Sequence, residues 1–70
     1  MLLSDMNTGE TATIVGVFEN HDYTTRLRSF GFVLGAKLIV LRVKRNAMHI
    51  RIGTSEWAIR RSTAEMVEVA

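Results

Sequence analysis

The sequence predicts a mainly β protein, a small antiparallel barrel of about five strands with one short helix after the first strand. Three observations predict this fold class. Short runs of branched aliphatic residues alternate with polar ones over most of the chain, and glycine-containing turns separate these runs. Only one segment of any length has helical spacing. Seventy residues are enough for one domain, which we expect to cover residues 1–70.

The first strand is expected over residues 11–18, where β-branched residues follow a turn at Gly9-Glu10. Gly16 lies inside this run. A glycine within a strand often marks a bulge or a sharp bend, and a small barrel needs such a bend at its corners. We therefore expect the strand to bend near Gly16.

The helix is expected over residues 22–30, where Tyr23, Leu27 and Phe30 recur at helical spacing. Gly31 follows this stripe and can adopt the left-handed conformation that ends a helix. A helix of about two turns is not stable alone. We therefore expect its apolar stripe to pack against the sheet.

The remaining strands are expected over residues 36–45, 48–52, 56–60 and 66–69, with short turns between the first three. Between the last two strands, residues 62–65 match the S-x-x-E capping box, which predicts one turn of helix. The chain would then close as a small barrel whose centre is filled by side chains.

The strand over 36–45 is apolar on both faces at its start, so its orientation decides the core. We place Ile39 and Leu41 on the inner face, and Leu38 and Val40 on the less buried face. The residues predicted to be buried are Leu27, Phe30, Ile39, Leu41, Ile50 and Ile59.

Composition excludes several classes of protein. The chain has no cysteine, so it can form neither a disulfide nor a thiolate metal site. It has no glycine-rich phosphate loop and no recognisable nucleophile arrangement. We therefore expect a protein that is not an enzyme and does not itself bind GTP.

The chain also lacks the pattern of a secreted or membrane-inserted protein. Ser4 and Asp5 end the apolar start at once, which argues against a signal peptide. The longest uninterrupted aliphatic run, residues 38–41, is far too short to span a bilayer. We therefore expect a cytoplasmic protein that is not membrane-inserted.

One cluster could hold a metal ion. Glu19, His21 and Asp22 lie together just before the predicted helix, while His49 stands alone on a strand. Fe²⁺ and Zn²⁺ accept imidazole together with carboxylate ligands. The alternative is that these residues cap the helix and are solvated. Any metal site here would be weak or completed by another chain, and no cofactor is required.

The net charge is +2, and its positive part is mostly arginine. Several of these cations lie on the predicted hairpin over residues 36–52. Charged residues on the outer face of a half-buried sheet are the ordinary arrangement. A small barrel that binds nucleic acid through this basic hairpin is the alternative function, although stacking aromatic residues usually accompany such charge.

A set of anchor residues recurs in a fixed order along almost the whole chain. The set comprises Leu3, Gly9-Glu10, Ile14, Arg26-Leu27, Phe30-Gly31-Phe32, Gly35-Ala36, the strand Leu38 to Arg42, Ala58-Ile59-Arg60, Ala64, Met66 and Val69. In this order the sequence resembles the FeoA family. It departs from the family in two places. Leu34 stands where a proline is frequent, and only Arg45-Asn46-Ala47 remains of a hairpin loop that is often longer.

The resemblance implies an SH3-like barrel and a role in bacterial ferrous-iron transport. It also implies a partner, the membrane transporter FeoB, which has a cytoplasmic GTP-binding domain. Nucleic acid is not the first choice of partner. We expect a monomer or a weak homo-oligomer.

If the resemblance holds, the hairpin is the expected contact with the transporter, because arginine is enriched at the energetic centres of interfaces. The candidate contact residues are Leu38, Val40, Arg42, Lys44, Arg51 and Arg60. Leu38 and Val40 would give apolar contact, and Arg42 would be a charged anchor. The alternative is that Leu38 and Val40 face the protein's own helix.

Overall fold

The computed structural model describes residues 1–18 and 27–70. Its elements are η1 (Leu3–Asp5), β1 (Thr11–Val17), β2 (Lys37–Val43), β3 (Ala47–Ile52), β4 (Ser55–Arg60), α2 (Arg61–Ala64) and β5 (Val67–Val69). Residues 27–29 of the predicted helix are helical, and its first part, with Tyr23, lies outside the described residues. The predicted mainly β fold is therefore confirmed, with strand boundaries that differ from the prediction by one residue or two.

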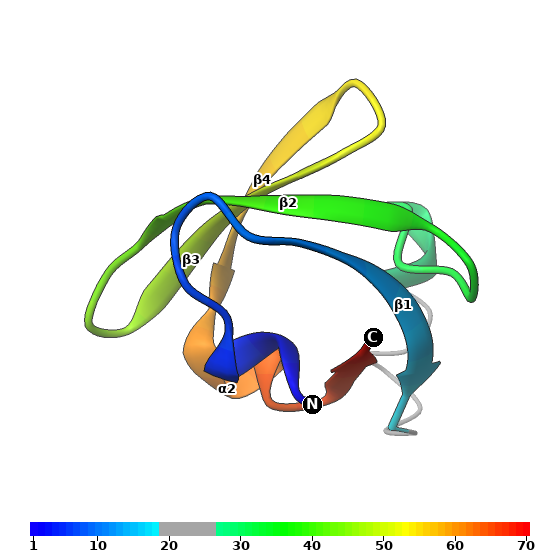
Figure 1. The fold of residues 1–70 in the computed structure, drawn as a ribbon, viewed down its shortest axis with the longest axis horizontal. Helices are drawn as coiled ribbons and strands as arrows, with labels where there is room; N and C mark the ends of the chain where they lie inside the picture. The colour runs from blue at the N-terminus through cyan, green and yellow to red at the C-terminus, as the bar shows by residue number, and fades with distance from the viewer. Residues whose placement is uncertain (19–26) are drawn as a thin grey trace.

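The strands form an antiparallel sheet in the order β4-β3-β2-β1-β5. The sheet curls so that β2 lies over η1, α2 and the edge strand β5, and the two ends of the chain lie close together beneath it (Figure 1). The amide of Val69 donates to the carbonyl of Met1 over 2.8 Å. The core fills the space under the curled sheet.

A bulge bends β1, as Gly16 predicts. The pairing of β1 with β5 shifts its register between Ile14 and Gly16. A Cβ atom at Gly16 would lie 3.4 Å from the Cβ of Glu68, which is the near limit of ordinary van der Waals contact, so β1 and β5 approach each other closely here. Because the bulge changes the alternation, Ile14 is buried while Phe18 is 56% exposed.

The end of the helix is a Schellman motif centred on Gly31. The amide of Phe32 donates to the carbonyl of Leu27, and that of Gly31 donates to the carbonyl of Arg28. Gly31 has a φ of 93°, which is the left-handed conformation that glycine adopts without strain. Leu27 and Phe32 are both buried, so the motif anchors the helix end in the core.

The predicted orientation of β2 is wrong. Leu38 and Val40 are buried, with 3% and 0% of their surface exposed. They lie opposite Ile52 and Ile50 of β3. Ile39 and Leu41 are only half-buried. Both faces of this strand are aliphatic, so the alternation alone could not choose between them, and the register with β3 decides.

The rest of the predicted core is confirmed except at Phe30. Leu27, Ile50 and Ile59 are buried. Phe30 is half-buried, and its ring stacks on Trp57 with centroids 4.4 Å apart. The ring therefore covers the edge of the core without entering it.

The one-turn helix predicted at residues 62–65 is present as α2, but its cap differs from the prediction. α2 begins at Arg61 after Arg60, whose side chain makes no capping hydrogen bond. Ala64 is fully buried, so packing against the core holds this turn. Within residues 1–18 and 27–70, no helix is long and apolar enough to cross a membrane.

Candidate binding surfaces

Arginine and lysine side chains, together with one histidine, gather on the outer face of the three-stranded part of the sheet, β2–β3–β4. We call this surface the hairpin face. Its members are Arg42, Lys44, His49, Arg51 and Arg60. All are exposed except His49, which is half-buried. The sheet therefore brings side chains from three strands together on one surface.

Strand register places these side chains next to one another. Arg42 lies directly opposite His49, and directly opposed residues have Cβ atoms about 4.5–5.5 Å apart. Arg60 lies opposite Ala47, so it is a diagonal neighbour of His49. Arg51 lies opposite Glu56, with a closest N–O distance of 4.0 Å. Both of these side chains are largely exposed, so the pair neutralises the surface only weakly.

Two predicted contact residues do not belong to this surface. Leu38 and Val40 point into the core and are buried, so neither can contact a partner without unfolding the sheet. The alternative placed them against the protein's own helix, and the structure shows both within the buried core. In their place Ile39, half-buried and opposite Arg51, gives the hairpin face its aliphatic part. Sequence alternation placed Ile39 on the wrong side.

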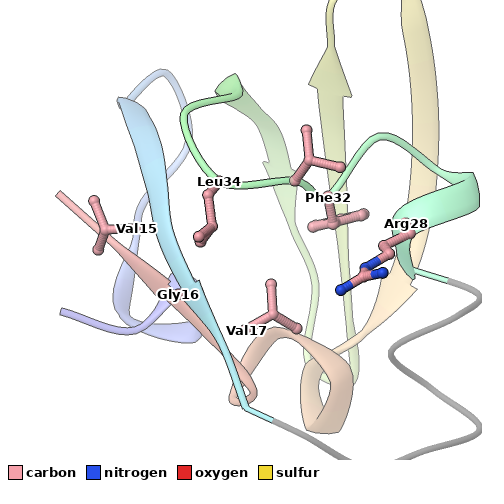
Figure 2. Close-up of a pocket in the computed structure, with 7 residues that line it drawn as sticks. Val15, Gly16, Val17, Arg28, Phe32 and Leu34 are labelled. Carbon is pink, nitrogen blue, oxygen red and sulfur yellow. The ribbon is translucent and has the colours of Figure 1, made fainter.

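A second surface lies between β1 and the loop that follows the helix. We call it the β1 groove, and its volume is about 570 Å³. Its lining residues are Val15, Gly16, Val17, Arg28, Phe32, Val33 and Leu34. Figure 2 shows Val17 and Leu34 turned toward each other from opposite walls, with the guanidinium of Arg28 directed into the same space.

The β1 groove has exposed aliphatic walls. Leu34 is 71% exposed, Val33 47% and Val15 50%. Phe32, in contrast, is buried and forms the floor. Large aliphatic side chains gathered on a surface often mark an interaction site. One feature of the sequence could have indicated this surface. Val33 and Leu34 lie in a turn between Gly31 and Gly35, where polar residues are more usual.

The predicted metal ligands Glu19, His21 and Asp22 lie outside the described residues. Among residues 1–18 and 27–70, no group of three histidine, cysteine or acidic side chains could hold a metal ion. His49 is flanked by Arg42 and Arg60, and neighbouring cations oppose the binding of another one. The described surfaces are therefore suited to anionic and apolar partners.

Comparison with known proteins identifies relatives over the full length of the chain. Residues 1–70 match the family model described as the FeoA domain. No curated protein matches the sequence.

Solved structures of FeoA proteins resemble the chain closely. A crystal structure of an iron uptake regulatory protein, FeoA, is 28% identical with a TM-score of 0.92, covering 99% of this chain and 93% of that one. FeoA from Chlorobium tepidum is 31% identical with a TM-score of 0.90, covering 99% and 68%. The zinc complex of Stenotrophomonas maltophilia FeoA, described as an SH3 domain protein, is 26% identical with a TM-score of 0.89, covering 100% and 89%.

Proposed function

The chain belongs to the FeoA family, and we propose that it is a cytoplasmic accessory protein of bacterial ferrous-iron uptake that binds and regulates a FeoB-like transporter. The family is one of non-enzymatic accessory proteins, in agreement with the predicted lack of catalysis. Two relatives support the proposed role by their descriptions. One is an iron uptake regulatory protein, and the other possibly acts as a ferrous iron transport activating factor.

The observation that carries the proposal is the hairpin face. Arg42, Lys44, Arg51 and Arg60 are all exposed on one side of the sheet, and one of them, Arg51, has an acidic neighbour on the next strand. Clustered cations attract an acidic surface from a distance, and the arginine fork then pairs with carboxylates in a fixed geometry. We therefore infer that this face binds an acidic patch on the transporter's cytoplasmic domain.

Charge reversal on the hairpin face tests this inference. The double substitution Arg42→Glu with Lys44→Glu should weaken binding to the purified cytoplasmic domain of the host's transporter at least about tenfold, or roughly 1.4 kcal/mol. Both side chains are exposed, so the fold should persist. Calorimetry measures the affinity, and circular dichroism checks the fold.

A matched control lies on the same strand. Lys37 is exposed at the other end of β2, opposite Thr13. Lys37→Glu should leave the affinity within about twofold, because electrostatic attraction falls with distance and with salt. The single variant Arg42→Glu changes the net charge by the same amount as Lys37→Glu, so equal losses in these two variants would point to net charge instead of this face. Unchanged binding in the double variant would exclude the hairpin face.

Nucleic-acid binding through the same cations is less well supported. Proteins that bind single strands combine charge with aromatic stacking platforms. Trp57 lies opposite Ile50, on the inner side of the sheet, and stacks on Phe30. The cations of the hairpin face are therefore not accompanied by the rings of Trp57 and Phe30, on which bases could stack. Salt-sensitive, submicromolar binding of a single-stranded oligonucleotide would favour this alternative.

Transition-metal binding stays a prediction. It rests on Glu19, His21 and Asp22, and a zinc complex of a relative supports it. Titration of the chain with Zn²⁺ or, without oxygen, with Fe²⁺ should give weak binding that His21→Ala abolishes. If the variant still binds the metal, the site does not include His21.

A further inference from the structure

We propose that the β1 groove binds an extended peptide that carries branched aliphatic side chains and one carboxylate. This site is separate from the hairpin face and does not depend on the identity of the transporter. Three features of the groove carry the proposal: aliphatic walls and, among the described residues, a strand edge without a partner strand and a cation without an ion pair.

The free edge belongs to the second half of β1. β1 pairs with β2 only over Thr11–Thr13, and Ile14 exchanges hydrogen bonds with the loop residues Gly35 and Ala36. Beyond the bulge, β1 pairs with β5 on one side. On its other side, no residue of the described chain pairs with Val15–Val17. Such an edge is a template for an added strand.

The walls suit alternate side chains of such a strand. Val17 and Leu34 face each other across the groove (Figure 2), and Phe32 closes the floor. An extended peptide presents every second side chain to the same side, so its aliphatic residues would cover Val33 and Leu34. Covering these exposed side chains removes apolar surface from water, which favours binding.

Arg28 defines the charge of the peptide. It lines the groove, and Figure 2 shows its guanidinium directed inward. The side chain is exposed, and no residue within 1–18 or 27–70 forms an ion pair with it. A guanidinium beside an apolar groove selects a carboxylate, with which it forms two parallel hydrogen bonds.

A peptide fits these features better than a lipid does. A fatty acid could satisfy Arg28 and the aliphatic walls, but it has no amide groups to pair with the edge of β1. A membrane surface would require a cluster of cations, whereas the groove lining contains one, Arg28. The geometry therefore assigns the groove to polypeptide.

Titration with short peptides tests the proposal. We would add the acetylated and amidated heptapeptide GVTETIG, in which valine, glutamate and isoleucine share one side, to the full ¹⁵N-labelled chain and follow the amide resonances by NMR. We expect saturable shifts at Val15, Val17, Val33 and Leu34. The peptide GVTKTIG, in which lysine replaces glutamate, should bind at least about tenfold more weakly, because its charge has the same sign as that of Arg28.

Substitutions of Arg28 give the sharpest readout. Arg28→Glu should reverse the preference, so that GVTKTIG binds better than GVTETIG. Arg28→Gln should bind the two peptides equally, which keeps the test decisive if the charge reversal disturbs the fold. Arg42→Glu, on the hairpin face, is the matched control and should leave the preference unchanged.

Several results would overturn the proposal. They include the absence of saturable shifts, shifts confined to the hairpin face, equal binding of the two peptides by the unaltered chain, and tight binding of myristate without peptide binding. Self-association that occupies the groove would also overturn it and would show as shifts that depend on protein concentration alone. Two further peptides, each N-methylated at one of the two sets of alternate backbone amides, separate strand pairing from burial of side chains. If the peptide pairs with the edge of β1, methylation of the set that faces β1 should abolish binding, and methylation of the other set should not.

Discussion

The hairpin face and the β1 groove differ in how far their strands are hydrogen-bonded and in which side chains they expose. Behind the hairpin face, β3 is paired along its whole length with β2 and β4, and the side chains turned to solvent are mostly cations. At the β1 groove, no described residue pairs with the strand edge beyond the bulge, and the exposed side chains other than Arg28 are aliphatic. Charge on the hairpin face can guide and orient a partner, whereas the groove retains unused hydrogen-bonding groups and apolar surface.

This difference separates two kinds of binding that a single partner could combine. Electrostatic attraction mainly raises the association rate and weakens with salt. Burial of apolar surface and pairing of a strand edge mainly lower the dissociation rate, because those contacts form only in the docked complex. A transporter domain that used both surfaces would show both signatures in one measurement.

The largest expected effect contrasts the core behind the hairpin face with the wall of the groove. Ile50 is fully buried and Leu34 is 71% exposed. Ile50→Ala should cost roughly 2–5 kcal/mol of unfolding free energy, because it leaves a cavity. Leu34→Ala should change it by less than about 0.5 kcal/mol. Urea denaturation measures both, and a large loss for Leu34→Ala would mean that this residue serves stability more than binding.

A smaller effect contrasts two glycines in left-handed turns. Gly31 has a φ of 93°, and a Cβ there would lie 3.3 Å from Cγ2 of Ile52. Gly53, in the β3–β4 turn, has a φ of 60° and open space around it. Each alanine substitution should cost about 1–2 kcal/mol for the backbone conformation, and Gly31→Ala should cost more than Gly53→Ala. Thermal unfolding compares the stabilities of the two variants. An equal loss of stability would show that the Ile52 side chain moves aside at no cost.

The smallest effect concerns the ion pair on the hairpin face. Arg51 and Glu56 are 4.0 Å apart, with 48% and 63% of their side chains exposed. A double-mutant cycle with alanine at both positions should give a coupling of no more than about 0.5 kcal/mol. A coupling well above that value would show that this face contributes to stability, and the contrast drawn with the groove would weaken.

The sequence by itself determined the elements and their order. Alternation located the strands, helical spacing located the helical residues 27–29, and Gly16 and Gly31 predicted the bulge and the helix end. These signals are local, because a strand, a bulge or a Schellman motif depends on residues within a few positions of one another. The cations of the hairpin face followed as well, since Arg42 and Arg51 lie on neighbouring strands of one hairpin.

Only the tertiary structure decided which face of β2 is buried and where the groove lies. Leu38 and Ile39 are equally apolar, so local preference could not orient the strand. Pairing with β3 and the register shift between Val40 and Arg42 did so. The groove lies between Val17 of β1 and Leu34 of the loop before β2, and these two segments come together only in the folded sheet. Contacts between segments distant in sequence depend on packing, and alternation within one segment carries no information about them.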